Sequence, residues 1–255
     1  MQIYVCVKHV PDSATRITIL DKNRFDESVV FLINPYDENA IEAAVSLKEK
    51  VGDTEVIAVT LGKDKAINTL RAALALGIDR GIFIKTDHYP DSMVTARALK
   101  AAIEQDGKAD IIFAGKESID SEGMQTLFRL AYGMDIPVAT NVINFSLDEK
   151  KVTVECEMEA GAREVLKMSL PCVIGACKGL NTPRYAKLPD IMKARKKEIK
   201  KIDLDNLDID SPTGSIEILE LKPVIEERKG KILSGEPEEV VKEFVEILTN
   251  EAKIF

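Results

Sequence analysis

The 255-residue chain has no tryptophan, only two histidines and four cysteines. Cys6, Cys156, Cys172 and Cys177 lie mainly in apolar stretches, and none of them belongs to a Cys-x-x-Cys pair. Structural zinc sites combine such pairs with each other or with histidines, so the composition argues against one. The pattern predicts reduced, buried thiols, as expected in a cytoplasm.

The most recognisable nucleotide-binding and catalytic motifs are also missing. No Gly-x-Gly-x-x-Gly follows an apolar run, and no Gly-x4-Gly-Lys-Ser/Thr is present. This argues against an ordinary NAD site and against a P-loop. His9 and His88 are isolated, and no serine, cysteine or lysine has a recognisable nucleophile setting. We therefore assign no catalytic residue and no metal ligand.

No apolar run approaches the length of a membrane span, so direct membrane insertion is not expected. The first residues, MQIYVCVKHV, resemble a strand and not a signal peptide or an Arg-rich presequence. We therefore expect a cytoplasmic protein. The formal net charge of −8 argues against general nucleic-acid binding, in spite of one local basic run.

Short apolar runs alternate with helical patterns along the first half of the chain. The runs at 3–7, 56–59, 82–84 and 111–114 are apolar throughout, which is typical of parallel strands covered on both faces. We predict an α/β fold: a three-layer, doubly wound, mainly parallel sheet of the Rossmann-like, adenine-nucleotide-binding type. Ligands of such folds bind at the carboxyl ends of the strands, here after Val7, Ile33, Val59 and Ala114.

The pattern changes after residue 138. Runs at 142–145 and 152–156 flank a polar turn and predict a small antiparallel hairpin, with a further strand at 164–168. From residue 202 the chain is polar and broken until Pro237 begins an amphipathic helix. We expect a nucleotide-binding domain at 1–210 and an extended C-terminal arm at 211–255. The arm has too little apolar surface to fold alone.

The loop after the fourth strand is a candidate ligand site. Gly115 ends the strand and would let a ligand approach the backbone, and Asp120 or Ser121 would cap the following helix. Amides at a helix start can hold phosphate. An ordinary helix start is the alternative interpretation. The loop's carboxylates, such as Glu122, would repel an anion unless a cation such as Lys116 offset them.

The stretch from Leu170 to Lys201 is unusual in charge. Residues 187–201 contain seven lysines or arginines against Asp190 and Glu198, a net of +5 in a chain of net charge −8. Asp190 stands where a helix N-cap is expected. A segment of opposite sign to its protein is a candidate contact surface, although most such runs are simply solvated helix faces.

Within this stretch, the order NTPRYAKLPDIMKARKKEI resembles the β-subunit signature of the electron-transfer flavoproteins. That signature is Asn-x-Pro-Arg-Tyr-Ala-x-Leu-Pro-x-Ile-Met-Lys-Ala-(Lys/Arg)-Lys-Lys. In the family it is a recognition loop that docks on partner dehydrogenases through a leucine, which corresponds to Leu188. The resemblance implies a recognition loop at 183–201 with these partner-binding residues: Arg184, Tyr185, Leu188, Pro189, Ile191, Met192, Lys193 and Lys196.

The same resemblance extends to the candidate ligand loop. The family carries a Gly-Lys/Arg-Gln-Ala-Ile-Asp loop at this place, ending in Gln-Thr in AMP-binding members, and Asn-Pro-aromatic begins its first helix. Ser121 to Met124 depart from that pattern. The resemblance implies these cofactor-binding residues: Cys6, Asn34, Pro35, Tyr36, Asp37, Leu61, Gly115, Lys116, Glu117, Ser118, Ile119, Asp120, Ser121, Glu122, Gly123, Met124, Gln125 and Thr126. Tyr36 would form a wall near the flavin.

The function implied is that of an electron-transfer flavoprotein β subunit, paired with an α subunit that holds most of the FAD, while AMP occupies the β site. Electrons would pass from acyl-CoA or related flavin dehydrogenases to a quinone oxidoreductase or similar acceptor. The chemistry belongs to the cofactor. One alternative is a bifurcating member with a second FAD and NADH as donor, but such members tend to carry Asp-Gly-Asp-Thr-Ala-Gln-Val in the loop. Another is a non-redox, universal-stress-type nucleotide-binding module.

Overall fold

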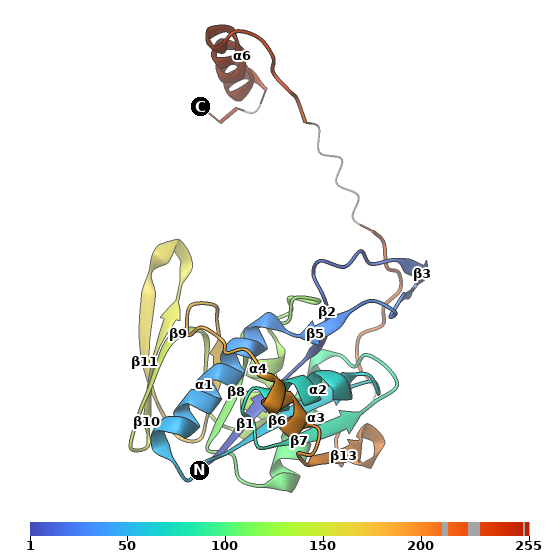
Figure 1. Cartoon of the computed structure of the whole chain (residues 1–255), viewed down its shortest axis with the longest axis vertical. Coiled ribbons are helices and arrows are strands. Elements are labelled where there is room, and N and C mark those ends of the chain that lie inside the picture. The colour runs from blue at the N-terminus through green and yellow to red at the C-terminus, as the bar shows by residue number, and fades with distance from the viewer. Residues whose placement is uncertain (211–213, 224–229, 252, 255) are drawn as a thin grey trace.

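The computed structural model of the chain describes residues 1–210, 214–223, 230–251 and 253–254. Figure 1 shows the course of the chain. The helices of the described part are α1 (Pro35–Val51), α2 (Ala66–Ala75), α3 (Ser92–Asp106), α4 (Thr126–Met134), α5 (Leu188–Ala194) and α6 (Pro237–Asn250). The strands of the main sheet are β1 (Gln2–Cys6), β6 (Glu55–Gly62), β7 (Arg80–Lys85), β8 (Ile111–Gly115), β9 (Val138–Asp148), β10 (Lys151–Glu157), β11 (Arg163–Ser169), β12 (Cys172–Ala176) and β13 (Ile199–Asp203).

The main sheet has the strand order β11-β10-β9-β12-β8-β1-β6-β7-β13. Every neighbouring pair from β9 to β13 is parallel, and β10 and β11 are joined to β9 as an antiparallel extension. The predicted fold class, a mainly parallel α/β sheet with a small antiparallel hairpin, is confirmed. The carboxyl ends of β1, β6 and β8 lie side by side at one edge of the sheet.

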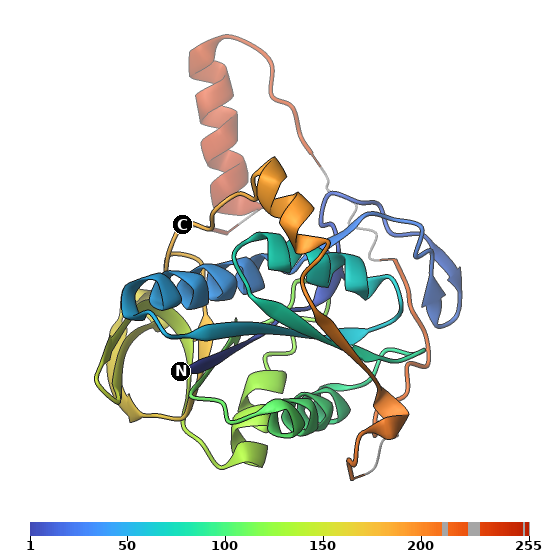
Figure 2. The ribbon, with the colours of Figure 1, turned by 60° about the horizontal axis from the view of Figure 1, so that its bottom comes forward.

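Helices cover both faces of the sheet. Figure 2 shows α1 and α2 on one face and α3 and α4 on the other. One buried apolar cluster includes Ile41 of α1 and Leu70 of α2, and the second includes Leu99 of α3 and Leu130 of α4. Each fully buried side chain of this size contributes about 1.5–3 kcal/mol to folding. The two clusters explain why the parallel strands are apolar throughout and do not alternate.

The hairpin begins earlier than the sequence predicts. β9 starts at Val138, and its first residues pair in parallel with β12 before the strand pairs antiparallel with β10. The register with β12 shifts between Ile174 and Ala176, and Asn141 lies in the left-handed region with φ 54°. A bulge of this kind bends a strand, which lets β9 serve both parts of the sheet.

The segment after β12 corrects the expected helix cap. α5 begins at Leu188 after Lys187, so Asp190 lies in its first turn and is not its N-cap. Proline is favoured at the start of a helix, and Pro189 occupies that position. The basic run does not continue as a helix, because β13 forms the sheet edge beside β7. Lysines are common on edge strands because they discourage pairing with another chain.

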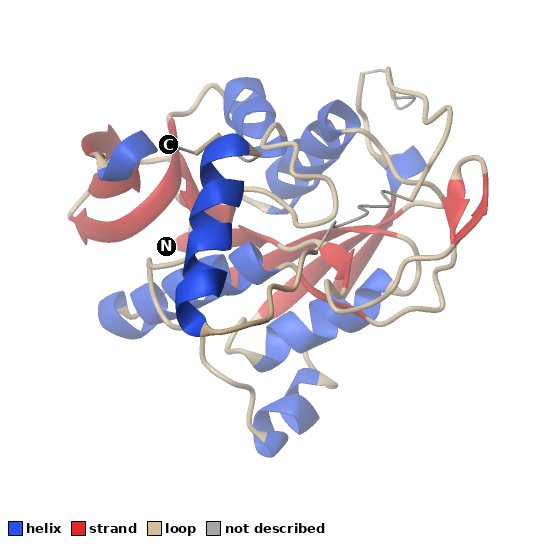
Figure 3. Ribbon diagram, turned by 90° about the horizontal axis from the view of Figure 1, so that it is seen from above, coloured by secondary structure: helices blue, strands red, loops and turns tan. Residues whose placement is uncertain are grey.

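Two short strand pairs lie outside the main sheet: β2 (His9–Pro11) with β5 (Phe31–Ile33), and β3 (Ile19–Asp21) with β4 (Arg24–Phe25). Figures 1 and 3 show the β3–β4 pair at the periphery of the molecule. The backbone amide of Leu221 donates to the carbonyl of Lys22 at this pair, and the amide of Ser215 donates to Asp91. The beginning of the predicted arm therefore runs along the domain.

The last helix has the predicted start at Pro237, but none of its residues is buried. Its side chains Val241, Phe244 and Val245 are exposed, and Figure 1 shows α6 clear of the sheet. A division of the chain at residue 210 stays a prediction. Among the described helices, none combines the length and the apolarity needed to cross a membrane.

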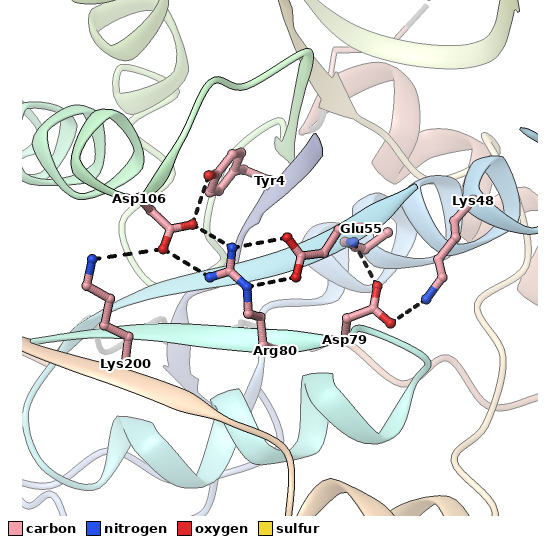
Figure 4. A network of polar contacts seen from close by, with 8 residues as sticks. Tyr4, Lys48, Glu55, Asp79, Arg80, Asp106 and Lys200 are labelled. Atoms are coloured by element: carbon pink, nitrogen blue, oxygen red, sulfur yellow. Dashed lines mark hydrogen bonds and ion pairs between the residues drawn. The ribbon is translucent and has the colours of Figure 1, made fainter. Parts of the chain in front are cut away.

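An ion-pair network holds the amino ends of β6 and β7 against the end of α3 (Figure 4). Arg80 donates to both carboxylate oxygens of Glu55, at 2.9 and 3.1 Å, and to both of Asp106, at 3.0 and 2.8 Å. The hydroxyl of Tyr4 donates to Asp106 at 2.9 Å, and the Lys200 ammonium lies 3.9 Å from it. Bidentate pairs of this kind are stronger than single ones, and a charge left alone here would be destabilising.

We expect Arg80→Met to lower the free energy of unfolding by about 1–3 kcal/mol, because it leaves the shielded Asp106 carboxylate without its main partner. Arg163→Met is the matched control, since its 3.4 Å pair with Glu155 is largely exposed. That change should cost less than about 0.5 kcal/mol. Chemical denaturation of the two variants measures the difference, and equal losses would contradict the assignment.

Candidate functional site

The buried Asp37 carboxylate joins three segments at the carboxyl edge of the sheet. It lies in the first turn of α1 with 4% of its surface exposed. It accepts hydrogen bonds from the backbone amides of Lys8 and Gly115, at 2.7 and 2.9 Å, and from the side-chain amide of Asn34 at 3.0 Å. The ends of β1 and β8 and the beginning of α1 are thereby fixed to one another.

Asn34 extends this arrangement into the ligand loop. It occupies the N-cap position before Pro35, but its side chain makes no capping hydrogen bond. Its amide donates to the carbonyl of Glu117 at 2.8 Å, and its side-chain oxygen accepts from the amide of Ile119 at 3.1 Å. An Asn-Pro start of α1 therefore determines where the loop after β8 runs.

Lys8 is a residue that sequence reasoning left out of the site. Its ammonium nitrogen lies 3.0 Å from Ser118 Oγ, 2.7 Å from an Asp120 oxygen and 3.4 Å from Ser121 Oγ. Lys8 therefore offsets the negative charge of Asp120. Its position two residues after β1, at the carboxyl end of a strand, is the feature of the sequence that could have indicated it.

Lys116 makes no ion pair with Glu122. Its ammonium nitrogen pairs with Glu117 at 3.1 Å and lies 5.1 Å from the centre of the Tyr36 ring.

The two glycines of the loop have different roles. A Cβ on Gly115 would lie 2.5 Å from an Asp37 oxygen and 2.6 Å from Tyr36 Cβ. The close approach that requires this glycine is therefore that of α1, and the approach of a ligand to its backbone stays a prediction. A Cβ on Gly123 would meet only the Ser121 carbonyl, at 3.9 Å. Glu122 and Met124 on either side have left-handed φ values of 46° and 49°.

The expected helix cap after β8 is wrong. α4 begins at Thr126 with Gln125 at the N-cap position, so Asp120 and Ser121 lie several residues before the helix. The structure brings Asn34, Asp37 and the loop from Gly115 to Ser121 into direct contact, whereas Gln125 and Thr126 lie at the other end of the loop. The assignment of this loop to a cofactor stays a prediction.

Cys6 and Leu61 lie at the same sheet edge, on neighbouring strands. Cys6 pairs with Val59, two residues before Leu61, and both candidate side chains are half-buried. Burial, and then the negative charge of Asp37, raises the pKa of the Cys6 thiol to about 12. The thiol therefore remains protonated at neutral pH and can line a site without acting as a nucleophile.

The second candidate site is an apolar tip around α5. Tyr185 is 94% exposed and Leu188 73% exposed, and Ile191 and Met192 are exposed beside them. The other predicted partner-binding residues Pro189, Lys193 and Lys196 are exposed as well. A groove of about 590 Å³ lies between α2 and the segment 182–195. A cluster of exposed apolar residues rimmed by charge is typical of a protein–protein contact.

Arg184 is the exception among the predicted partner-binding residues. Its guanidinium donates to Glu42, at 2.8 and 3.0 Å, and to Glu49, at 2.6 and 3.0 Å. Both carboxylates belong to α1, so this arginine makes its ion pairs within the chain.

Comparison with known proteins decides the family. The family model for the electron transfer flavoprotein domain matches residues 23–207, which is most of the chain. The chain belongs to the electron transfer flavoprotein β-subunit family. It is 37% identical over 263 positions to the electron transfer flavoprotein subunit beta of Bacillus subtilis, covering both chains completely. It is also 37% identical over the full length to the mitochondrial subunit beta of Arabidopsis thaliana.

The electron transfer flavoprotein subunit beta of Sus scrofa is 39% identical over 216 positions, which cover 82% of this chain and 84% of the pig protein. The matched family region contains Asn34, Asp37 and Gly115 as well as the apolar tip, whereas Lys8 lies before it. The resemblance expected from the signature around Leu188 is confirmed.

We expect Gly115→Ala to lower the free energy of unfolding by about 1–3 kcal/mol, because the new methyl group would overlap Asp37 and Tyr36. Gly123→Ala is the matched control in the same loop, where the space is open. Its effect should stay within about 0.5 kcal/mol. Denaturation curves of both variants test this, and tolerance of Gly115→Ala would contradict the close approach.

Asp37 also predicts a dependence of stability on pH. Burial raises its pKa to about 6 against the opposing effect of the hydrogen bonds from Lys8, Asn34 and Gly115. A folded pKa above the unfolded value near 3.9 means that its contribution is fully present below about pH 4 and is lost as pH rises through 6. The difference amounts to about 2–3 kcal/mol.

The measurement is the unfolding free energy of the wild type and of Asp37→Asn between pH 4 and 7. Subtracting the variant removes the titration of the other groups. The wild type should lose stability relative to the variant as pH rises across this range. A difference that is constant with pH, or that grows in the opposite direction, would refute the shift.

Proposed function

We propose that this chain is the β subunit of a heterodimeric electron-transfer flavoprotein that works in the cytoplasm. Its α subunit would hold most of the FAD, with Tyr36 of this chain forming part of the wall near the flavin. Electrons would pass from a flavin dehydrogenase to this FAD and then to a quinone oxidoreductase or a similar acceptor. The observation that carries the proposal is similarity to named β subunits along the full length of the chain.

The site around Asp37 is proposed to hold AMP. The loop from Gly115 to Thr126 and the segment that begins at Asn34 would form it, with Cys6 and Leu61 as apolar lining. Lys8 supports an anionic ligand because its ammonium group already lies among Ser118, Asp120 and Ser121. A phosphate at this place would compete with the Asp120 carboxylate for Lys8. Hydrogen bonds from backbone amide groups of the loop would also stabilise it.

Two other functions make different claims about this site. A bifurcating flavoprotein would hold a second FAD here and accept electrons from NADH. The Gln125-Thr126 ending of the loop favours AMP over a second FAD. A non-redox nucleotide-binding module would need no docking surface. The exposed apolar tip at Tyr185 and Leu188 favours the electron-transfer function, because no other part of the described structure covers these two side chains.

The tip is proposed to dock on acyl-CoA or related flavin dehydrogenases. Leu188 would enter an apolar pocket of the dehydrogenase, and Lys193 and Lys196 would steer the encounter with an acidic surface. The arm at 211–255 is proposed to pack on the α subunit through α6. The exposed apolar side chains of α6, including Phe244, support this because such a helix face is stable only when covered.

The nucleotide content of the purified α/β pair tests the function. Denaturation followed by chromatography should release one FAD and one AMP for each pair. Two FAD for each pair, with one of them reduced by NADH, would establish the bifurcating reading. Absence of any flavin and of a coloured partner chain would refute the redox proposal altogether.

Leu188→Ala tests the docking anchor. We expect the second-order rate constant for reduction by a substrate-reduced acyl-CoA dehydrogenase to fall about tenfold, because a buried anchor residue is worth more than 1 kcal/mol at an interface. The flavin content should not change. Leu20→Ala removes an equally large exposed side chain on β3 and should leave the rate unaltered. Unchanged kinetics in Leu188→Ala would exclude the anchor.

A further inference from the structure

The segment that carries the apolar tip is held to α1 at its beginning. The amide of Asn39 donates to the carbonyl and the side-chain oxygen of Asn181, at 3.1 and 3.0 Å, and Asn181 donates back to the Asn39 carbonyl at 2.9 Å. Three residues later, Arg184 forms its bidentate pairs with Glu42 and Glu49, and its backbone amide also donates to Glu42 at 3.0 Å. Together these contacts form the α1 clamp.

The same segment is held to α2 at its end. The Arg71 guanidinium donates to the carbonyls of Ala194 and Lys197, at 2.8 and 2.6 Å. In return, the Lys197 ammonium donates to the carbonyls of Leu74 and Ile78, at 2.9 and 2.5 Å. These two carbonyls belong to the last turn of α2 and the residues after it, where a cation is favoured by the helix dipole. These four bonds form the α2 clamp.

Between the two clamps, the side chains that could meet a partner are exposed to solvent. Tyr185, Leu188 and Met192 are exposed, and the short helix α5 has only Ala194 buried. An isolated helix of this length has almost no stability in water. Its conformation therefore depends on its packing against α2 and on the clamps at the two ends of the segment.

We propose that Arg184 and Lys197 are positioning residues, which hold the apolar tip in its docking conformation and do not themselves bind the dehydrogenase. The inference rests on the proposed docking function. It assigns both cations to acceptors within the chain and leaves the steering of partners to exposed lysines such as Lys193 and Lys196. Burial lowers the pKa of Lys197, as expected for an ammonium group removed from solvent.

Preorganisation explains why such clamps would affect docking. Ordering a mobile segment at the moment of binding costs conformational entropy, which weakens affinity without changing any interfacial contact. A segment already held at both ends avoids this cost. Loss of a clamp should therefore raise the dehydrogenase concentration needed for half-maximal rate, while the electron-transfer rate at saturation stays the same.

The experiment uses the complete α/β pair with Glu42→Ala/Glu49→Ala, which frees Arg184 and leaves every residue of the tip unchanged. The control Glu104→Ala/Glu164→Ala makes the same change of charge at exposed sites on α3 and β11. Reduction is followed with a substrate-reduced acyl-CoA dehydrogenase over a range of concentrations. Hydrogen exchange of residues 185–193 is measured on the same samples.

We expect the clamp variant to exchange faster at 185–193, to need an about tenfold higher half-saturating concentration, and to keep its flavin content and saturating rate. The control should match the wild type. Faster exchange with unchanged half-saturation would overturn the positioning role, and so would unchanged exchange. Failure of the wild-type pair to be reduced at all would instead refute the docking function, and the exchange data would then show whether the clamps order the tip.

A second pair of variants separates positioning from steering at the other clamp. Lys197→Met should raise half-saturation by a factor that is the same at low and high salt, because the lost ammonium group faces carbonyls within the chain. Lys196→Met should mainly reduce the dependence of the rate on salt. A Lys197→Met effect that disappears at high salt would show that Lys197 steers the partner, which would overturn the assignment.

Discussion

The burial of one carboxylate, that of Asp37, is the constraint on which the proposed nucleotide site depends. A buried carboxylate is destabilising unless several donors face it, and here they come from the residues after β1, from the loop before α1 and from β8. The hydrogen bond from the Gly115 amide brings α1 close to β8. The glycine is needed there because a side chain would overlap Asp37 and Tyr36. The geometry of the loop that follows is therefore set by packing within the chain before any ligand binds.

Charged side chains serve two different purposes in this molecule. Arg80, Arg184 and Lys197 bind carboxylates or carbonyls of the chain itself and connect elements far apart in the sequence. Lys193 and Lys196 are exposed at the tip. A count of charges cannot distinguish these roles, because the difference lies in which acceptors the fold brings within reach of each side chain.

The fold could be predicted from the sequence, and both candidate sites remain predictions, but several contacts could not be foreseen. Continuous apolar strands indicate a parallel sheet, and the signature around Leu188 indicates the docking segment. β13 was missed because its two isoleucines stand among lysines and do not form an apolar run. The caps at Asp120 and Asp190 were wrong because local propensity cannot tell how long a loop runs before its helix. Lys8 and the Arg184 pairs depend on tertiary contacts that span about 100 residues or more.

The path of the segment between β12 and β13, which carries the apolar tip, also bears on the order in which the chain folds. It connects β12 in the interior of the sheet to β13 at its edge, and β8, β1, β6 and β7 lie between these strands. Such a crossing is a contact of long range, and the α1 and α2 surfaces to which it attaches must exist before it can be fixed. The tip therefore depends for its structure on contacts that only the folded α1 and α2 layer provides. A nascent or partly unfolded chain would present no ordered tip, so the proposed recognition by a partner would also report that the layer beneath the tip is complete.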